Sequence, residues 1–173
     1  RFAVEPIAGA ELATVLACVT GHVPSDVAGA GRSFAELYLI VNAVDGVASG
    51  AYVYDEDARG LVLLRAGDFR GSAGHLDLGQ RLAADAAVNC YWLCDLEPVL
   101  ARYGNRGYRA AQLEAAIAGG RSYLAAYALG LAATGLTFFD DDVTAFFSPH
   151  AAGKSVMFLT AIGRLRRAPA SMP

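Results

Sequence analysis

The sequence predicts an α+β fold built on a mostly antiparallel sheet. Three observations favour this class: β-forming runs occur in groups, one long apolar helix dominates the second half, and hydrophobic residues make up 55% of the 173 residues. A chain of this length can bury a substantial core. We therefore expect a single domain over residues 1–173, either a whole protein or part of a longer, tandem one.

The first half of the chain is predicted to hold one helix and three strands. Apolar residues at helical spacing, from Leu12 to Val19, predict a helix over residues 10–20. Runs rich in β-forming residues predict strands over 36–44, 51–54 and 61–65, with a turn over 55–60 between the last two. Segments 22–34 and 68–79 are rich in small and polar residues and are predicted to be loops.

The second half is predicted to be mainly helical between two strands. An apolar run predicts a buried strand over 86–95, followed by a short helix or turn over 96–103 and a long helix over 109–131. A Thr-Gly-Leu turn over 134–137 leads to a short helix over 143–147 that opens on acidic residues. A strand over 155–162 and a basic tail over 164–173 complete the chain.

The long helix has almost no polar face. Between residues 109 and 131 the only charged side chains are Arg109, Glu114 and Arg121. A helix that is apolar all round is buried. We therefore expect it to be covered on every side, by its own domain or by a partner chain, and the apolar composition favours a large subunit interface.

Composition and charge exclude several classes of function. The net charge is −3 and the chain has no basic block, so nucleic-acid binding is not expected. No apolar run approaches the roughly 18 residues of a membrane span. The cysteines Cys18, Cys90 and Cys94 are an odd number without the spacing of a disulfide framework, which indicates a reducing cytoplasm. Cys90 and Cys94 are interpreted as buried, inert thiols and not as zinc ligands.

A glycine-containing loop is the first candidate binding element. Its small residues would let a phosphate or a ring approach the backbone closely, and the residues concerned are Gly29, Ala30, Gly31 and Arg32. The loop precedes a strand, so it matches neither a Rossmann nor a Walker motif. A plain flexible loop is the alternative.

Two pairs of residues that include arginine are further candidates. Tyr108 and Arg109 open the long helix, where they could transfer a proton or bind an anion, or simply form a polar helix start. In the tail, Arg164 and Arg166 could hold a phosphate, or could be solvated.

The three acids at 140–142 are explained by a helix N-terminus, so no metal site is predicted. A hydrolase is disfavoured because no nucleophile elbow is present.

Six segments, taken in order, resemble the nitroreductase-like flavoprotein superfamily, and specifically the SagB/ThcOx type of azoline dehydrogenase. The opening Arg1-Phe2 and the run from Ala28 to Tyr38 resemble the family's first motifs. Gly50 to Asp55 is similar to its Gly-x-Tyr-x-Tyr-Asp hairpin. The other segments lie on the second half of the chain, at 103–109 with 113–115, at 124–131 with 139–141, and on the last strand to Gly163.

The resemblance implies an α+β homodimer that binds FMN at the subunit interface and transfers hydride between a substrate and the flavin. Gly29, Ala30, Gly31 and Arg32 would lie near the ring, and the backbone N–H groups of Gly135 and Leu136 would face its N5/O4 edge. Arg164 or Arg166 would reach the phosphate, and Tyr108 and Arg109 would transfer protons. The substrate would be a modified peptide or a small nitro or quinone compound, with NAD(P)H as a candidate electron donor.

The chain also departs from the family pattern. Ala28 replaces a serine of the loop motif, Gly135 replaces a proline of the flavin-edge turn, and Arg121 falls on the asparagine of a Gln-Asn pair. The family's arginine-rich opening would lie upstream of Arg1. These departures leave open a second function, a dimerisation or peptide-handling domain of the same fold that has lost flavin and is not catalytic.

Overall fold

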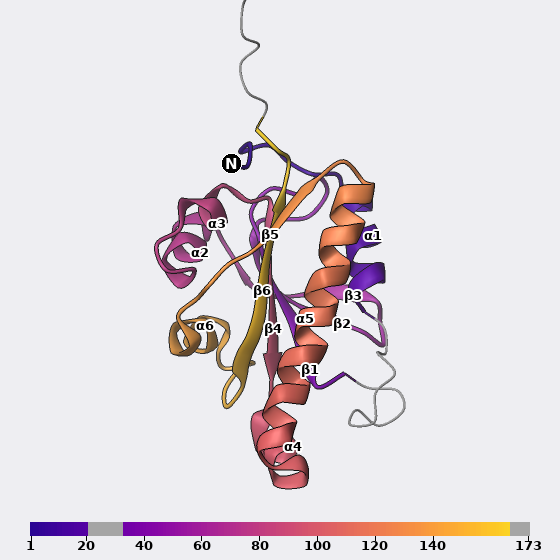
Figure 1. Ribbon diagram of the computed structural model, residues 1–173. Helices are drawn as coiled ribbons and strands as arrows, with labels where there is room; N and C mark the ends of the chain where they lie inside the picture. Colours follow the sequence, from indigo (N-terminus) through magenta and orange to yellow (C-terminus); the bar gives the residue numbers. More distant parts are fainter. Residues whose placement is uncertain (21–32, 167–173) are drawn as a thin grey trace, which may run out of the picture.

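A six-stranded antiparallel sheet forms the centre of the computed structural model, which describes residues 1–20 and 33–166 (Figure 1). The strand order is β3-β2-β1-β4-β6-β5, and every neighbouring pair is antiparallel. In chain order the strands are β1 (Ala35–Val41), β2 (Gly50–Asp55), β3 (Gly60–Ala66), β4 (Val88–Cys94), β5 (Ala132–Gly135) and β6 (Ser155–Gly163). The predicted α+β class with a mostly antiparallel sheet is confirmed.

Helices cover both faces of this sheet (Figure 1). One face carries α1 (Gly9–Val19) and the long α5 (Asn105–Ala128), with α4 (Leu96–Tyr103) packed at the start of α5. The opposite face carries α2 (Arg70–Leu76), α3 (Arg81–Asp85) and α6 (Asp140–Phe147). The sheet is therefore a middle layer between two separate helical layers.

Alternation along the central strand β1 divides the core in two. Leu37 and Leu39 point into the cluster beneath α1 and α5, while Tyr38 and Ile40 point into the cluster beneath α2 and α6. Successive side chains of a strand point to opposite faces. Because both faces are covered by helices, β4 at the middle of the sheet is buried along its whole length, which agrees with its near-continuous apolar sequence.

Small residues line the inner face of α5. The buried positions of this helix include Gly107, Ala111, Ala115 and Gly119. A Cβ atom at Gly119 would lie 2.3 Å from the ring of Phe158 on β6. That distance is too short for any side chain, so glycine is what allows α5 to lie so close to the sheet.

Large apolar residues lie on the outer face of the same helix. Leu113, Leu124 and Tyr127 are 63%, 72% and 56% exposed. The expectation that this helix is covered on every side is therefore met only on its inner face within a single chain. The exposed residues mark a surface that a partner could cover. Leu113, Leu124 and Tyr127, with the half-buried Ile117 between them, are called the α5 stripe below.

Two local predictions are wrong. Segment 68–79 was expected to be a loop, but α2 forms within it because Ala73 and Leu76 are buried against the sheet and the Asp68 side chain accepts a hydrogen bond from the Arg70 backbone N–H. The turn expected over 134–137 instead begins within β5, whose last residue, Gly135, pairs with Thr160 of β6. In both cases tertiary contacts override weak local preferences.

Two further observations bear on the classes of function considered. Within residues 1–20 and 33–166, no helix combines the length and the hydropathy that a membrane span requires. The same described residues contain no cluster of three or more histidine, cysteine, aspartate or glutamate side chains arranged to hold a metal ion.

Candidate functional site

The end of β5 lies beside the C-terminal half of α5, and it carries the residues predicted to face a flavin edge. The backbone N–H of Gly135 donates a hydrogen bond to the hydroxyl oxygen of Tyr123 on α5. The rings of Tyr123 and Tyr127 contact each other edge to face, with centroids 5.9 Å apart. Leu136 is half-buried and packs against the cores beneath α2, α3 and α6. The donor that sequence analysis assigned to a cofactor therefore already has a partner within the chain.

Tyr108 and Arg109 lie at the other end of α5. Both are exposed, and the Tyr108 hydroxyl oxygen accepts a hydrogen bond of 3.2 Å from the side-chain amide of Gln112. At 1.5 Å per residue, the helix rises about 22 Å between Tyr108 and Tyr123. A single chain therefore does not bring the predicted proton-transfer residues to the predicted flavin edge.

Arg164 is fixed in an ion pair beside the N-terminal segment of the chain. Its guanidinium lies 2.9 Å from the Glu11 carboxylate and donates a 3.0 Å hydrogen bond to the Pro6 carbonyl. Glu11 also accepts a hydrogen bond from the Ala8 backbone N–H at the start of α1. Arg166 is exposed, and its backbone N–H donates to the Arg1 carbonyl. The charge of Arg164 is thus balanced by Glu11, which leaves Arg166 as the better placed candidate for a phosphate.

The remaining predicted residues, Gly29, Ala30, Gly31 and Arg32, lie outside the described residues. The described chain resumes at Ser33, and Phe34 donates its backbone N–H to one carboxylate oxygen of Glu114 over 3.0 Å. Glu114 on the inner face of α5 is 9% exposed, and its other oxygen has no hydrogen-bond partner among the described residues.

Glu114 is the polar residue of this region whose role sequence analysis missed. It lines a cavity of about 20 Å³ together with Trp92 and Ser33, which is enough space for one water molecule. Its isolation in an apolar helix was visible in the sequence, but its partner Phe34 lies 80 residues away along the chain. The carboxylate joins α5 to the chain that follows the predicted cofactor loop.

The described residues fit an FMN ring in part. Such a site needs an apolar surface, hydrogen-bond donors for the ring edge and a cation for the phosphate. Leu124 and Tyr127 supply an exposed apolar surface near the end of β5. The Gly135 donor is bonded to Tyr123, and the Arg164 cation is paired with Glu11. Both would have to exchange partners before they could hold the cofactor.

Comparison with known proteins gives the same fold. The model of the nitroreductase family matches residues 2–164. A nitroreductase-like protein of Anabaena variabilis ATCC 29413 is 30% identical in sequence, with a TM-score of 0.85 over 95% of this chain. The match covers 35% of the Anabaena chain, so this chain spans about a third of its relative's length. No curated protein matches the sequence.

Two more distant structures share the fold. A chain of the E. coli microcin synthetase complex McbBCD, solved with truncated pro-MccB17 bound, is 16% identical, with a TM-score of 0.77 over 96% of this chain and 67% of its own. The NADPH:FMN oxidoreductase of Vibrio harveyi, complexed with NAD+, is 13% identical, with a TM-score of 0.59 over 100% of this chain and 66% of its own. With the family match across nearly the whole sequence, these findings show that the chain belongs to the nitroreductase family.

Proposed function

We propose that this chain acts as an FMN-dependent oxidoreductase, of the nitroreductase or azoline dehydrogenase type, and that it works as a homodimer joined through α5. Family membership supports the redox chemistry. The structural observation that carries the proposal is the α5 stripe, an exposed apolar surface beside the end of β5. A stripe of this kind on an otherwise well-packed domain indicates an interface.

A second copy of the same chain is the occupant that the stripe fits best. Leu113, Ile117, Leu124 and Tyr127 recur at steps of four, seven and three residues, the spacing typical of a seam between two packed helices. In a twofold dimer the same patch meets itself. Such a pairing would cover both stripes at once.

Twofold symmetry would also complete the site. The midpoint of α5 falls at Ala116 and Ile117. If two copies pack antiparallel about this point, Tyr108 and Arg109 of one copy reach the level of Leu124 and Ala125 of the partner subunit. These positions adjoin Tyr123 and Gly135, so the dimer would remove the separation of about 22 Å found within one chain.

In this proposal each predicted residue has a defined task. When bound, FMN supplies the redox chemistry by passing a hydride between two substrates. Backbone N–H groups of Gly135 and Leu136 would hold the polar edge of the ring, with the loop of Gly29, Ala30, Gly31 and Arg32 beside it. Arg166, or Arg164 once released by Glu11, would hold the phosphate. Tyr108 and Arg109 from the partner subunit would move protons.

The substrate is proposed at the level of chemical class. The resemblance to SagB/ThcOx proteins supports an azoline within a modified peptide, and the E. coli neighbour was solved with a peptide, truncated pro-MccB17. A small nitro or quinone compound is the other class. NAD(P)H is the proposed electron donor, since the Vibrio harveyi neighbour was solved with NAD+. We place the protein in the cytoplasm, in line with its free thiols.

One observation favours the second function, a dimerisation or peptide-handling domain without flavin. The Tyr123 hydroxyl occupies the Gly135 N–H, and Glu11 neutralises Arg164. If these contacts persist in the dimer, two of the groups that would hold FMN remain bonded to Tyr123 and Glu11 and cannot contact the cofactor. The two functions therefore share the dimer and differ only in cofactor uptake.

The decisive experiment measures mass and FMN uptake on the same protein. Size-exclusion chromatography with light scattering should give a dimer, and titration should give one FMN per chain. Leu124→Glu places a charge in the stripe and should yield a monomer that does not retain FMN. The control Leu100→Glu adds the same charge to an exposed leucine of α4, 38% exposed, and should leave both properties unchanged.

Each proposal fails on a different result. A monomeric wild-type protein would refute the dimer. A dimer that takes up no added FMN would refute the oxidoreductase and support the domain without flavin. Where the wild-type protein binds FMN, Tyr123→Phe tests whether Tyr123 competes for the Gly135 N–H. The variant frees this donor and should tighten FMN binding by about fivefold, the value of one modest hydrogen bond.

A further inference from the structure

A cavity of about 520 Å³ lies on the sheet face opposite α5, between the β2–β3 hairpin and the loop that follows α6. Its apolar lining includes Ala51, Leu64, Phe146 and Phe147, and its polar lining includes Arg65 and His150. We call it the Arg65–His150 pocket. Its volume is in the range of small-molecule sites, which are mostly apolar with a few placed polar groups.

Arg65 is held in position at one side of this pocket. Its guanidinium lies 4.7 Å from the ring centroid of Phe69 and 4.5 Å from that of Phe146, and it donates a hydrogen bond of 3.3 Å to the Phe146 carbonyl. Within the described part of the chain no carboxylate forms an ion pair with it. A guanidinium has five N–H donors, so most remain for a ligand.

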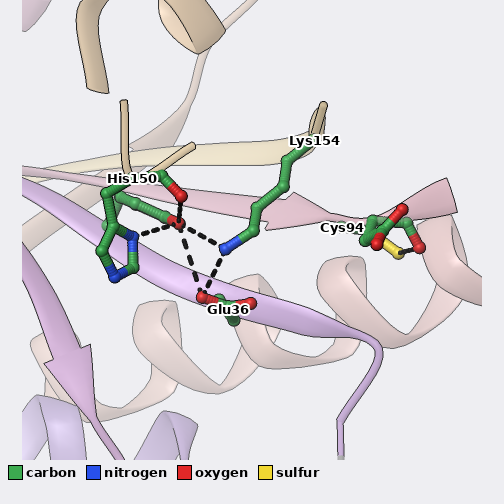
Figure 2. Close-up of polar contacts among 6 residues, drawn as sticks. Glu36, Cys94, His150 and Lys154 are labelled. Atoms are coloured by element: carbon green, nitrogen blue, oxygen red, sulfur yellow. Dashed lines mark hydrogen bonds and ion pairs between the residues drawn. The ribbon is translucent and has the colours of Figure 1, made fainter. Parts of the chain in front are cut away.

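His150 is held at the pocket by a polar network (Figure 2). Its Nδ1 lies 2.8 Å from the hydroxyl oxygen of the buried Tyr38. Lys154, the only lysine of the chain, donates 2.7 Å hydrogen bonds to that same oxygen and to the Glu36 carboxylate. In Figure 2 the dashed lines from Lys154, His150 and Glu36 meet at one oxygen, which is the Tyr38 hydroxyl.

This network favours the tautomer of His150 that carries its hydrogen on Nε2. Burial alone would lower the pKa of Lys154, but its bonds to Glu36 and Tyr38 outweigh burial and raise the pKa above its ordinary value of 10.5. The charged amine therefore donates to Tyr38, whose hydroxyl proton is directed to its nearest acceptor, Nδ1 of His150. Nε2 then carries a hydrogen in the neutral ring, and it also carries one in the protonated ring.

Among the residues that the structure describes, no carboxylate compensates the charge of Arg65 at this pocket. Lys154 is paired with Glu36 over 2.7 Å, so the two charges cancel locally. The Arg65 guanidinium remains, together with the Nε2–H donor of His150 and a lining of two phenylalanine rings. An anion that also carries an apolar body complements this combination, since charge-assisted hydrogen bonds to a carboxylate are the strong ones.

We propose that the Arg65–His150 pocket binds a small apolar carboxylic acid, with its carboxylate between the Arg65 guanidinium and His150 Nε2–H and its body on Phe146 and Phe147. A carboxylate matches the planar fork of arginine. The pocket lies across the sheet from the α5 stripe, so this site is separate from the proposed flavin site and does not depend on it.

Isothermal titration calorimetry with 3-phenylpropionate tests the site, with 3-phenylpropionamide as a neutral ligand of the same shape. The acid should bind to the wild-type protein at least tenfold more tightly than the amide. Arg65→Gln and His150→Gln should each weaken binding of the acid by about tenfold. Arg59→Gln, which removes a charge from the same hairpin outside this pocket, should have no effect.

The acid–amide comparison on the wild-type protein decides the proposal even if a variant folds poorly. Equal affinities for acid and amide would overturn it, as would no binding of 3-phenylpropionate at millimolar concentration. Unchanged binding in a folded Arg65→Gln protein would overturn it as well. Backbone amide shifts in NMR should cluster at Ala51, Phe146, Phe147, Ser148 and His150, and shifts confined to the α5 stripe would place the ligand elsewhere.

Discussion

Asp77 should make the stability of this protein depend on pH. Its side chain is fully buried at the end of α2; one oxygen accepts a 3.1 Å hydrogen bond from Tyr91, and the other has no partner among the described residues. Burial raises the pKa of this carboxyl from 3.8 to about 7, although the Tyr91 hydrogen bond acts to lower it. At 1.36 kcal/mol per pKa unit, this rise corresponds to about 4 kcal/mol.

The sign of the effect follows from proton binding. Between pH 4 and pH 7 the folded protein keeps the Asp77 proton while the unfolded chain has lost it. The free energy of unfolding therefore falls as pH rises through this window, and it levels off above the folded pKa. An asparagine at this position still accepts from Tyr91 but cannot ionise, so Asp77→Asn should remove the fall.

Urea denaturation of wild type and Asp77→Asn at a series of pH values measures this difference. The variant should gain stability relative to wild type by about 4 kcal/mol between pH 4 and pH 8, and every other titrating group cancels in the comparison. The control Asp45→Asn alters an exposed aspartate of the turn after β1 and should track wild type. A stability difference that does not change with pH would refute the argument that Asp77 is buried as an acid.

Two further predictions concern packing and thiol reactivity. Gly119→Ala should destabilise the fold by about 1–3 kcal/mol in urea denaturation, despite the better helix propensity of alanine, because the new Cβ would lie 2.3 Å from the Phe158 ring. In a Phe158→Ala background the same substitution should lose its penalty, and an unchanged penalty would contradict the proposed contact. Burial raises the pKa values of Cys90 and Cys94 to about 12, whereas Cys18 is exposed. A thiol reagent at pH 8 should therefore modify only Cys18 in the folded protein and all three cysteines in denaturant, and rapid native modification of Cys90 would contradict this assignment.

The central strands were predictable because their sequences carry the signal that the structure uses. The run predicted as a strand over 36–44 contains β1 almost entirely, and the run over 86–95 contains β4. The short edge strand β5 was not predictable, since its residues are two alanines, a threonine and a glycine. Alanine and glycine are depleted in strands, and only pairing with β6 gives this segment its conformation.

The site residues remain a prediction, and the structure shows contacts of theirs that the sequence did not indicate. The resemblance identified Gly135 and Arg164, yet it gave no sign that Tyr123 bonds to the first and Glu11 to the second. Such partners depend on how α1 and α5 pack, which no local pattern encodes. The charged residues of the long helix were visible in the sequence, but only the fold shows that Glu114 points inward.

The apolar sequence of α5 predicted that the helix is buried, but it did not show which side faces its own sheet. Apolar residues on a helix of a monomer normally face the core. In α5 the inner positions are small, such as Ala115 and Gly119, while the bulky Leu124 and Tyr127 face outward. Small inner residues let the helix lie close to the sheet, and the bulky outer residues have no packing partner among the described residues. We infer from this distribution that α5 has a second packing surface, which the proposed dimer would cover. The same residues that obscured a polar face in the sequence are thus the strongest structural argument for a dimer.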